Sequence, residues 1–204
     1  MKIAIVDVGI GNLGSLKSAL KKLNIPFTIC NDPKDFTGVD KIFLPGVGNF
    51  KEFMKKLQFK KLDLIIKDSV KKKIPIFGIC LGFQILFEES DEDSPTKGLD
   101  LIKGKFRNFN TLSAKIKVPH TGWNECKIVN SNKLFKNIPD NSDFYFTHSF
   151  YLENYLPENV ISKTNYHLDF VSSVFKNNIF GVQFHPEKSQ SNGLKLIKNF
   201  IGEC

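Results

Sequence analysis

The chain has 204 residues, enough for one compact domain with a sizeable hydrophobic core, and its apolar and aromatic contents are those of an ordinary globular protein. No apolar run is long enough to span a bilayer, so we expect no membrane partner. The net charge of +8 comes almost entirely from scattered lysines, with Arg107 as the only arginine, which argues against a nucleic-acid partner but leaves open a basic face for a phosphorylated metabolite or an acidic partner.

Short apolar segments alternate with amphipathic ones over the first ninety residues. The predicted strands are Lys2–Val8, Phe27–Cys30, Lys41–Leu44, which ends at Pro45, and Ile74–Ile79; the predicted helices are Leu13–Leu23, Phe50–Lys73 in two pieces, and Leu81–Glu88. Such alternation predicts a parallel sheet covered by helices on both faces. The first apolar segment is too short for a signal peptide and contains Asp7, so we expect a soluble, cytoplasmic protein.

After Ser90 the pattern changes toward short strands. A polar loop, Asp91–Gly98, is followed by predicted strands at Ile116–Val118, Asp143–Phe146 and Val171–Lys176. The last of these strands forms a hairpin that turns at Asn177-Asn178 and returns through Ile179–Phe184. A helix, Ser191–Ile201, closes the chain. We find no internal repeat and no linker. Residues 1–204 are therefore predicted to form a single α/β domain, whose C-terminal half is richer in antiparallel strand.

The four cysteines, at positions 30, 80, 126 and 204, form no Cys-x-x-Cys pair. Such spacing favours neither a zinc site nor a disulfide framework, so we predict no metal. Each cysteine therefore needs its own explanation, and Cys30 and Cys126 fit core packing.

Residues Gly9–Gly14 match the G-x-G-x-x-G pattern of dinucleotide-binding proteins. The match follows a predicted strand, opens a predicted helix, and has Asp32 near the end of the second strand. The alternative is a glycine-rich turn in which Asn12 caps the helix N-terminus. Both interpretations are kept at this point.

Cys80 lies in Gly78-Ile79-Cys80-Leu81-Gly82, directly after a buried strand. This pattern has the form of a nucleophile elbow with cysteine in place of serine. The two glycines allow a sharp turn, the following helix N-terminus favours the thiolate, and the Leu81 N–H is free to bind an oxyanion. A buried, inert cysteine is the alternative.

A nucleophile needs a base, and the base needs a group that orients it. In the segment Phe180–Glu187, residues two apart lie on the same face of an extended chain, so His185 and Glu187 can lie side by side. Pro186 stops the strand, which places the pair at the sheet edge where a cysteine elbow would also lie. Together they form a candidate Cys-His-Glu triad.

A glycine-rich turn, Leu44–Gly48, directly follows the third predicted strand. It can present a backbone N–H to the same sheet edge and so complete an oxyanion hole with Leu81. Three separate segments thus point to acyl transfer.

These segments resemble the class I glutamine amidotransferases, and within them the glutaminase subunits of imidazole glycerol phosphate synthase. The resemblance covers Asp7–Asn12, Leu44–Gly48, Gly78–Gln84, Val118–Asn124, Thr147–Ser149 and Gln183–Ser189, and so essentially the whole chain. Val47 is informative, because most other members have a Pro-Gly-Gly loop there. The resemblance implies a flavodoxin-like, doubly wound, mostly parallel sheet with an additional antiparallel C-terminal part.

The resemblance also implies a covalent mechanism without cofactor or metal. The Cys80 thiolate attacks the side-chain carbonyl of glutamine, His185 transfers protons, and Glu187 orients the imidazole. The residues implied for other roles are Val47 and Leu81 in the oxyanion hole, Gly48, Gln84, Ser149 and Phe150 in glutamine binding, and Asn12, Trp123, Asn124 and Lys188 near a partner. A plain core aromatic is the alternative for Trp123.

The implied partner is a (β/α)8-barrel cyclase subunit, joined in a heterodimer. It uses the ammonia to form imidazole glycerol phosphate and aminoimidazole carboxamide ribotide in histidine biosynthesis. One alternative keeps the glutaminase chemistry but supplies the ammonia to a different barrel partner, for example in amidino-sugar synthesis. Two others change the class of protein: a dinucleotide-binding module, and a stand-alone cysteine hydrolase of the dienelactone type, against which the adjacent His185 and Glu187 argue.

Overall fold

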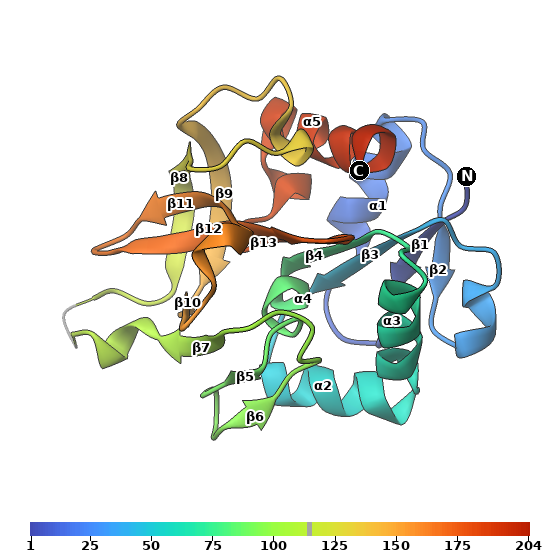
Figure 1. The fold of residues 1–204 in the computed structure, drawn as a ribbon, viewed down its shortest axis with the longest axis horizontal. Coiled ribbons are helices and arrows are strands. Elements are labelled where there is room, and N and C mark those ends of the chain that lie inside the picture. The colour runs from blue at the N-terminus through green and yellow to red at the C-terminus, as the bar shows by residue number, and fades with distance from the viewer. Residues whose placement is uncertain (114–115) are drawn as a thin grey trace.

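The computed structural model describes residues 1–113 and 116–204, and their strands form two sheets (Figure 1). The larger sheet has nine strands within these ranges, in the order β2-β1-β3-β4-β13-β12-β11-β8-β9. Its strands are β1 Ile3–Val6, β2 Thr28–Cys30, β3 Lys41–Gly46, β4 Ile76–Cys80, β8 His120–Ile128, β9 Ser142–His148, β11 Val160–Asn165, β12 Asp169–Lys176 and β13 Ile179–Val182. The smaller sheet, ordered β10-β7-β5-β6, contains β5 Glu89–Ser90, β6 Thr96–Lys97, β7 Lys105–Asn108 and β10 Phe150–Glu153.

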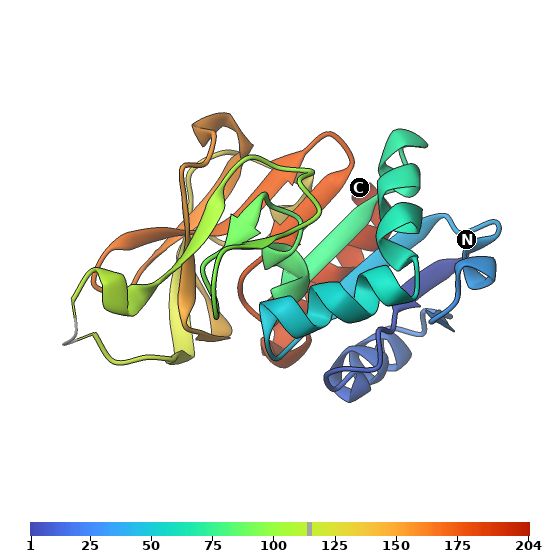
Figure 2. The same ribbon diagram turned by 90° about the horizontal axis from the view of Figure 1, so that it is seen from below.

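The larger sheet changes direction once along its width. Strands β2, β1, β3, β4 and β13 pair in parallel, whereas β12, β11, β8 and β9 continue the sheet antiparallel. Figures 1 and 2 both place the antiparallel part (yellow to orange) at one end of the molecule and the first strands and helices (blue to cyan) at the other. This is the predicted fold class, a doubly wound, mostly parallel core with an antiparallel C-terminal part.

Helices cover both faces of the parallel part because its strands are apolar on both sides. The helices are α1 Gly14–Lys22, α2 Phe50–Phe59, α3 Leu62–Lys71, α4 Leu81–Gln84 and α5 Gln190–Glu203. In β1, Ile3 and Ile5 pack in the core with α1 and α5, while Ala4 and Val6 pack in the core with α2 and α3. Successive strand residues point to opposite faces, so this one strand contributes to both cores.

Several predicted boundaries differ from the observed ones. The predicted strand Ile116–Val118 is wrong, since its residues are irregular and β8 begins only at His120, after Pro119, which has no N–H to donate to a ladder. Strand β3 continues through Pro45 to Gly46, because its pairing with β1 has already ended at Phe43.

The predicted helix Leu81–Glu88 is also wrong in its length, because α4 ends at Gln84. Beyond this point the N–H groups of Leu86 and Phe87 donate to carbonyls three residues back, and the Glu88 N–H donates to the Gly104 carbonyl instead of that of Gln84. The smaller sheet was not predicted, and β6 lies within the predicted loop Asp91–Gly98. Its strands are short, and their pairing depends on contacts distant in sequence.

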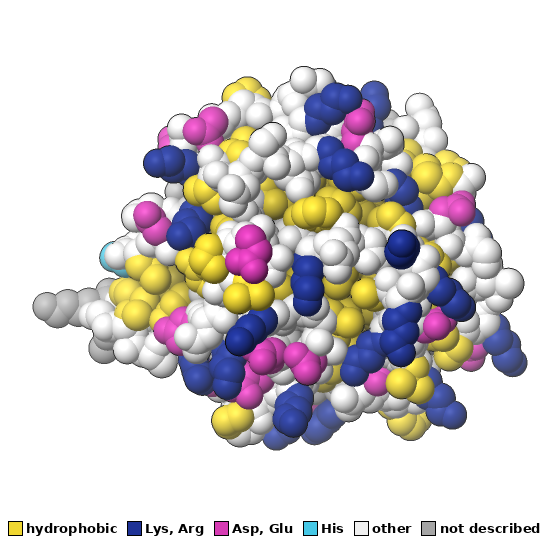
Figure 3. Space-filling view, in the orientation of Figure 1, with side chains coloured by type: hydrophobic (Ala, Val, Ile, Leu, Met, Phe, Trp, Pro, Cys, Tyr) yellow, Lys and Arg dark blue, Asp and Glu magenta, His cyan; other side chains and the backbone are white. Residues whose placement is uncertain are grey.

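On the face in Figure 3, the lysine and arginine side chains are interspersed with acidic and apolar ones. Among the described residues, no helix has both the length and the apolar character needed to cross a membrane.

Candidate active site

Cys80 is the last residue of β4 and lies at the turn from β4 into α4, which begins at Leu81. Its backbone has φ 53° and ψ −111°, a strained conformation for a residue with a side chain. The turn is tight because Gly82 packs directly on β3: a Cβ at Gly82 would lie 1.7 Å from the carbonyl oxygen of Leu44. The structure therefore contains the sharp strand-to-helix turn that the two flanking glycines predict.

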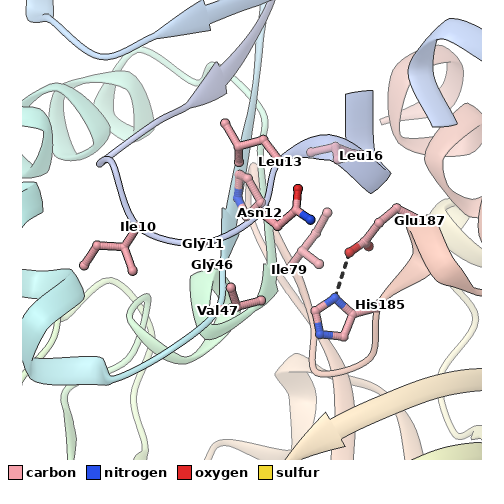
Figure 4. Close-up of a pocket in the computed structure, with 11 residues that line it drawn as sticks. Ile10, Gly11, Asn12, Leu13, Leu16, Gly46, Val47, Ile79, His185 and Glu187 are labelled. Atoms are coloured by element: carbon pink, nitrogen blue, oxygen red, sulfur yellow. Dashed lines mark hydrogen bonds and ion pairs between the residues drawn. The ribbon is translucent and has the colours of Figure 1, made fainter. Parts of the chain in front are cut away.

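His185 and Glu187 follow β13, the parallel neighbour of β4. The pairing of Val182 with Ile79 brings the ends of both strands to the same edge, and so brings His185 toward Cys80. His185 Nδ1 and Glu187 Oε1 lie 2.7 Å apart, and Figure 4 shows the imidazole and the carboxylate pointing toward each other. The carboxylate fixes the imidazole with its proton on Nδ1 and leaves Nε2 for proton transfer.

The charge state of His185 is set by its surroundings. Burial by itself would lower the pKa of His185, but the Cys80 thiolate and the Glu187 carboxylate together raise it to about 10. His185 is only 1% exposed, and within the described residues its Nε2 atom has no hydrogen-bond partner. The raised pKa keeps a proton on both imidazole nitrogens near pH 7, so Nε2 can pass its proton to a substrate or leaving group.

A pocket of about 260 Å³ opens beside the Cys80 thiol. Its lining contains every residue predicted for the oxyanion hole and for glutamine binding, together with Cys80 itself and four others: Val47, Gly48, Cys80, Leu81, Gln84, Glu92, Pro119, Thr147, His148, Ser149 and Phe150. Most of these residues come from the ends of β3, β4 and β9 and from the segments after them, while Glu92 follows β5 and Pro119 precedes β8. The structure thus gathers this predicted set around a single concave site.

Glu92 is a pocket residue that sequence reasoning missed. It lies in the predicted polar loop, where its only signal was a carboxylate within an acidic run. Its Oε2 atom accepts a hydrogen bond from the Phe50 backbone N–H at 2.7 Å, and burial raises the pKa of its carboxyl group above the usual value. A carboxylate in this position can pair with the α-ammonium group of an amino-acid substrate.

On the other side of the His185–Glu187 pair lies a small cavity of about 20 Å³ (Figure 4). It is lined by residues of the glycine motif, including Gly11 and Asn12, and by Val47. Gly11 packs so closely that a Cβ there would lie 2.7 Å from Val47 Cγ2. The space holds about one water molecule, not a pyrophosphate, so this loop supports the Val47 turn and gives no support to a dinucleotide site.

Asn12 does not act as the predicted helix cap. The N-cap residue of α1 is Leu13, which makes no side-chain capping bond, and Asn12 Oδ1 instead accepts from the Gly14 backbone N–H at 2.7 Å. Asn12 is exposed and lines a shallow groove with Glu187 and Lys188.

Three of the four residues predicted to face a partner lie at the surface. Trp123 is 47% exposed, so it is not a core aromatic, and its ring lies 6.0 Å from that of Tyr145. The Lys188 ammonium lies 5.6 Å from the same Tyr145 ring. Asn124 differs, because it projects from the opposite face of β8, where its Nδ2 donates to the Asn165 carbonyl at 2.9 Å. The structure therefore does not bring Asn124 together with Trp123 and Lys188.

Two buried histidines connect β8 to the pocket wall. His120 Nδ1 lies 2.9 Å from His148 Nε2, and His148 Nδ1 lies 2.8 Å from the Phe150 carbonyl oxygen. Because a carbonyl only accepts, both rings carry their proton on Nδ1. Burial lowers the pKa of His120 to about 4 and that of His148 to about 3, so both are neutral near pH 7.

These two histidines predict a loss of stability in mild acid. Their pKa values are lower in the folded chain than the usual 6.5, so the unfolded chain binds more protons once the pH falls below 6.5. We expect the free energy of unfolding, measured by urea denaturation, to fall by about 3 kcal/mol from pH 6.5 to 5.0. His185 does not offset this, because its raised pKa contributes stability that is fully present below pH 6.5 and is lost only toward pH 10.

The matched variants for this prediction are His120→Gln and His167→Asn. His120→Gln removes one buried titrating ring and should reduce the pH-dependent loss by roughly half. His167 is exposed, with φ 63°, a conformation that asparagine tolerates, so His167→Asn should leave the loss unchanged. Equal pH dependence in all three proteins would contradict the assignment.

The chain is similar to known proteins over nearly its whole length. The family model described as glutamine amidotransferase class-I matches residues 4–204. The chain is 44% identical over 198 residues to the imidazole glycerol phosphate synthase subunit HisH of Moorella thermoacetica, covering 97% of this chain and 93% of that protein. It is 46% identical over 200 residues to the subunit of the same name from Pyrococcus furiosus, covering 98% and 97%.

Solved structures show the same fold at lower identity. A glutamine amidotransferase from Thermotoga maritima superposes with a TM-score of 0.67 at 21% identity, covering 100% of this chain and 83% of that one. PurLQS from the same organism superposes with a TM-score of 0.72 at 18% identity, covering 98% and 97%. At these identities the likeness establishes the architecture alone.

Proposed function

The chain belongs to the class I glutamine amidotransferase family, and on that basis we propose that it works as the glutaminase subunit of an imidazole glycerol phosphate synthase. The observation that carries the chemistry is the placement of Cys80 and the His185–Glu187 pair at the ends of adjacent parallel strands. The near full-length relatives named as this subunit support the pathway.

The proposed reaction begins when the Cys80 thiolate attacks the side-chain carbonyl carbon of glutamine. The carbonyl oxygen takes up the negative charge and is stabilised by the backbone N–H groups of Leu81 and Val47. His185 then donates its proton to the departing nitrogen, so ammonia leaves and a glutamyl thioester remains. A water molecule, deprotonated by the now neutral His185, attacks the thioester and releases glutamate and the thiolate, while Glu187 orients the ring and stabilises the imidazolium whenever it forms.

The pocket supplies groups for the amino-acid end of the substrate. The Glu92 carboxylate can pair with the α-ammonium group, and the Gln84 amide can hydrogen-bond the polar ends of glutamine. Gly48, Ser149 and Phe150 also line the pocket, and we propose that their backbones hold the same end of the substrate. The pocket therefore suits a small zwitterion with an amide side chain.

The relatives are named as subunits, which implies a partner subunit for this chain as well. We propose that this partner is a (β/α)8-barrel cyclase, and that Trp123, Tyr145, Lys188 and Asn12 lie on the surface facing it. This surface lies next to the His185–Glu187 pair. Asn12 lines the small cavity together with His185 and Glu187, and it lines the shallow groove together with Glu187 and Lys188. We further propose a cytoplasmic location, which the four free cysteines favour.

The function is tested by glutamine turnover of the purified chain, alone and with a histidine-pathway cyclase subunit plus its nucleotide ligand. We expect weak turnover alone and a stimulation of about 10²–10³-fold in the complex. The reason is that the Val47 N–H must point into the pocket, and one oxyanion donor is worth about that factor. Val47 lies between Gly46 and Gly48, and Gly48 has φ 104°, so this turn can change conformation.

Equal turnover with and without the partner would contradict the proposed role of the Val47 turn. Absence of stimulation, with Cys80 still modified by a glutamine-analogue alkylating agent, would keep the glutaminase chemistry and assign the chain to a different ammonia acceptor. A cyclase that uses free ammonia is the control, because it shows that the partner itself is active.

A further inference from the structure

Gln183 is a buried polar side chain that the mechanism above does not use. It follows the last residue of β13, is 0% exposed, and its backbone N–H donates to the Ser172 carbonyl at 2.9 Å. Its side chain lies between two residues of the glutamine pocket, Cys80 and Gln84. A buried amide is costly unless its polar atoms are paired, so its two contacts define its role.

The contacts of Gln183 fix which end of its amide faces the sulfur. Gln84 Nε2 donates to Gln183 Oε1 at 3.1 Å. Since Gln84 Nε2 is only a donor, the carbonyl of Gln183 must face it, and the NH₂ group must then face Cys80. Gln183 Nε2 lies 3.8 Å from Cys80 Sγ, within reach of an N–H···S hydrogen bond.

We propose that Gln183 is a positioning residue that directs an N–H donor at the Cys80 thiolate and, through its carbonyl, orients the Gln84 amide toward glutamine. This role deepens the proposed glutaminase function and rests on it. A donor aimed at a sulfur atom stabilises the thiolate more than the thiol. Because Gln84 uses one donor on Gln183, its carbonyl oxygen stays available to the substrate.

Other titratable groups lie around the sulfur. His185 and Glu187 approach from the segment after β13, His148 from β9, and Glu92 from the loop after β5. None of these is changed by substituting Gln183. The effect of Gln183 on the reactivity of the sulfur is therefore measured by comparing proteins that differ at Gln183 and keep these four side chains.

The test is the rate at which iodoacetamide alkylates Cys80 in the purified full chain, followed from pH 5 to 10 by the mass of the peptide that contains Cys80. Gln183→Met has a similar length but no donor, and it should move the midpoint of the profile upward, with a roughly tenfold slower rate below the midpoint. Gln183→Glu is nearly isosteric and adds a negative charge near the sulfur, so it should move the midpoint further in the same direction.

Gln84→Met removes the donor that orients the Gln183 amide but keeps the Gln183 side chain beside the sulfur. It should raise KM for glutamine while shifting the alkylation midpoint by much less than Gln183→Met does. An unchanged profile in both Gln183 variants would overturn the proposal. Alkylation needs neither glutamine nor a partner, so its result is independent of whether the proposed glutaminase function holds.

Discussion

Cys80→Ala is expected to lower the rate of glutamine hydrolysis by at least about 10⁴-fold, because removal of the nucleophile leaves only binding and the oxyanion hole. The fold should tolerate the change. Alanine has the same Cβ as cysteine, so it meets the same backbone strain at φ 53° and adds no atoms to the turn. The measurement is glutamate release by the chain in complex with the cyclase subunit.

The control for this prediction is synthesis from free ammonia. Ammonia added to the solution bypasses the thiol, so the Cys80→Ala complex should form imidazole glycerol phosphate from ammonia at the rate of the unmodified complex. Loss of both glutamine-dependent and ammonia-dependent synthesis would show that Cys80 supports the structure of the complex and is not the nucleophile.

Gly82→Ala is expected to cost at least about 4 kcal/mol in the free energy of unfolding, or to prevent folding altogether. The added methyl group would lie 1.7 Å from the Leu44 carbonyl oxygen and 2.7 Å from its carbonyl carbon. Both atoms belong to the backbone of β3, which is paired with β4, so neither can move without breaking the sheet next to Cys80. Urea denaturation of the purified protein measures the effect.

Gly202→Ala is the matched control for this glycine. Gly202 lies near the end of α5, is exposed, and would have no atom within 4 Å of an added Cβ. Alanine is a better helix former than glycine, so this change should stabilise the chain by up to about 1 kcal/mol. If the two variants had the same stability, the close approach of Gly82 to β3 would be refuted.

The local elements were largely predictable because they depend on residues near one another in the chain. The alternation of short apolar segments with amphipathic ones predicted β1 to β4 and α1 to α3, and the Asn177-Asn178 turn predicted the β12–β13 hairpin. The predictions failed where distant contacts decided the outcome. The helix after Cys80 is short because the Glu88 N–H, which would have continued it, donates to the distant Gly104 carbonyl.

The sequence by itself determined the chemical groups of the site and their local geometry. Glycines on both sides of Cys80 require a tight turn, and the spacing of His185 and Glu187 places imidazole and carboxylate within reach of each other. Such short-range relations follow from backbone geometry, which residue type and spacing restrict strongly.

Only the tertiary structure decided which groups surround the sulfur. The parallel pairing of β4 with β13 brings together segments about a hundred residues apart, and it places the Gln183 amide beside Cys80. The loop after β5 brings Glu92 into the pocket, while β8 directs Asn124 away from Trp123. Strand pairing and loop packing depend on the shape of the whole core, which no local pattern of residues encodes.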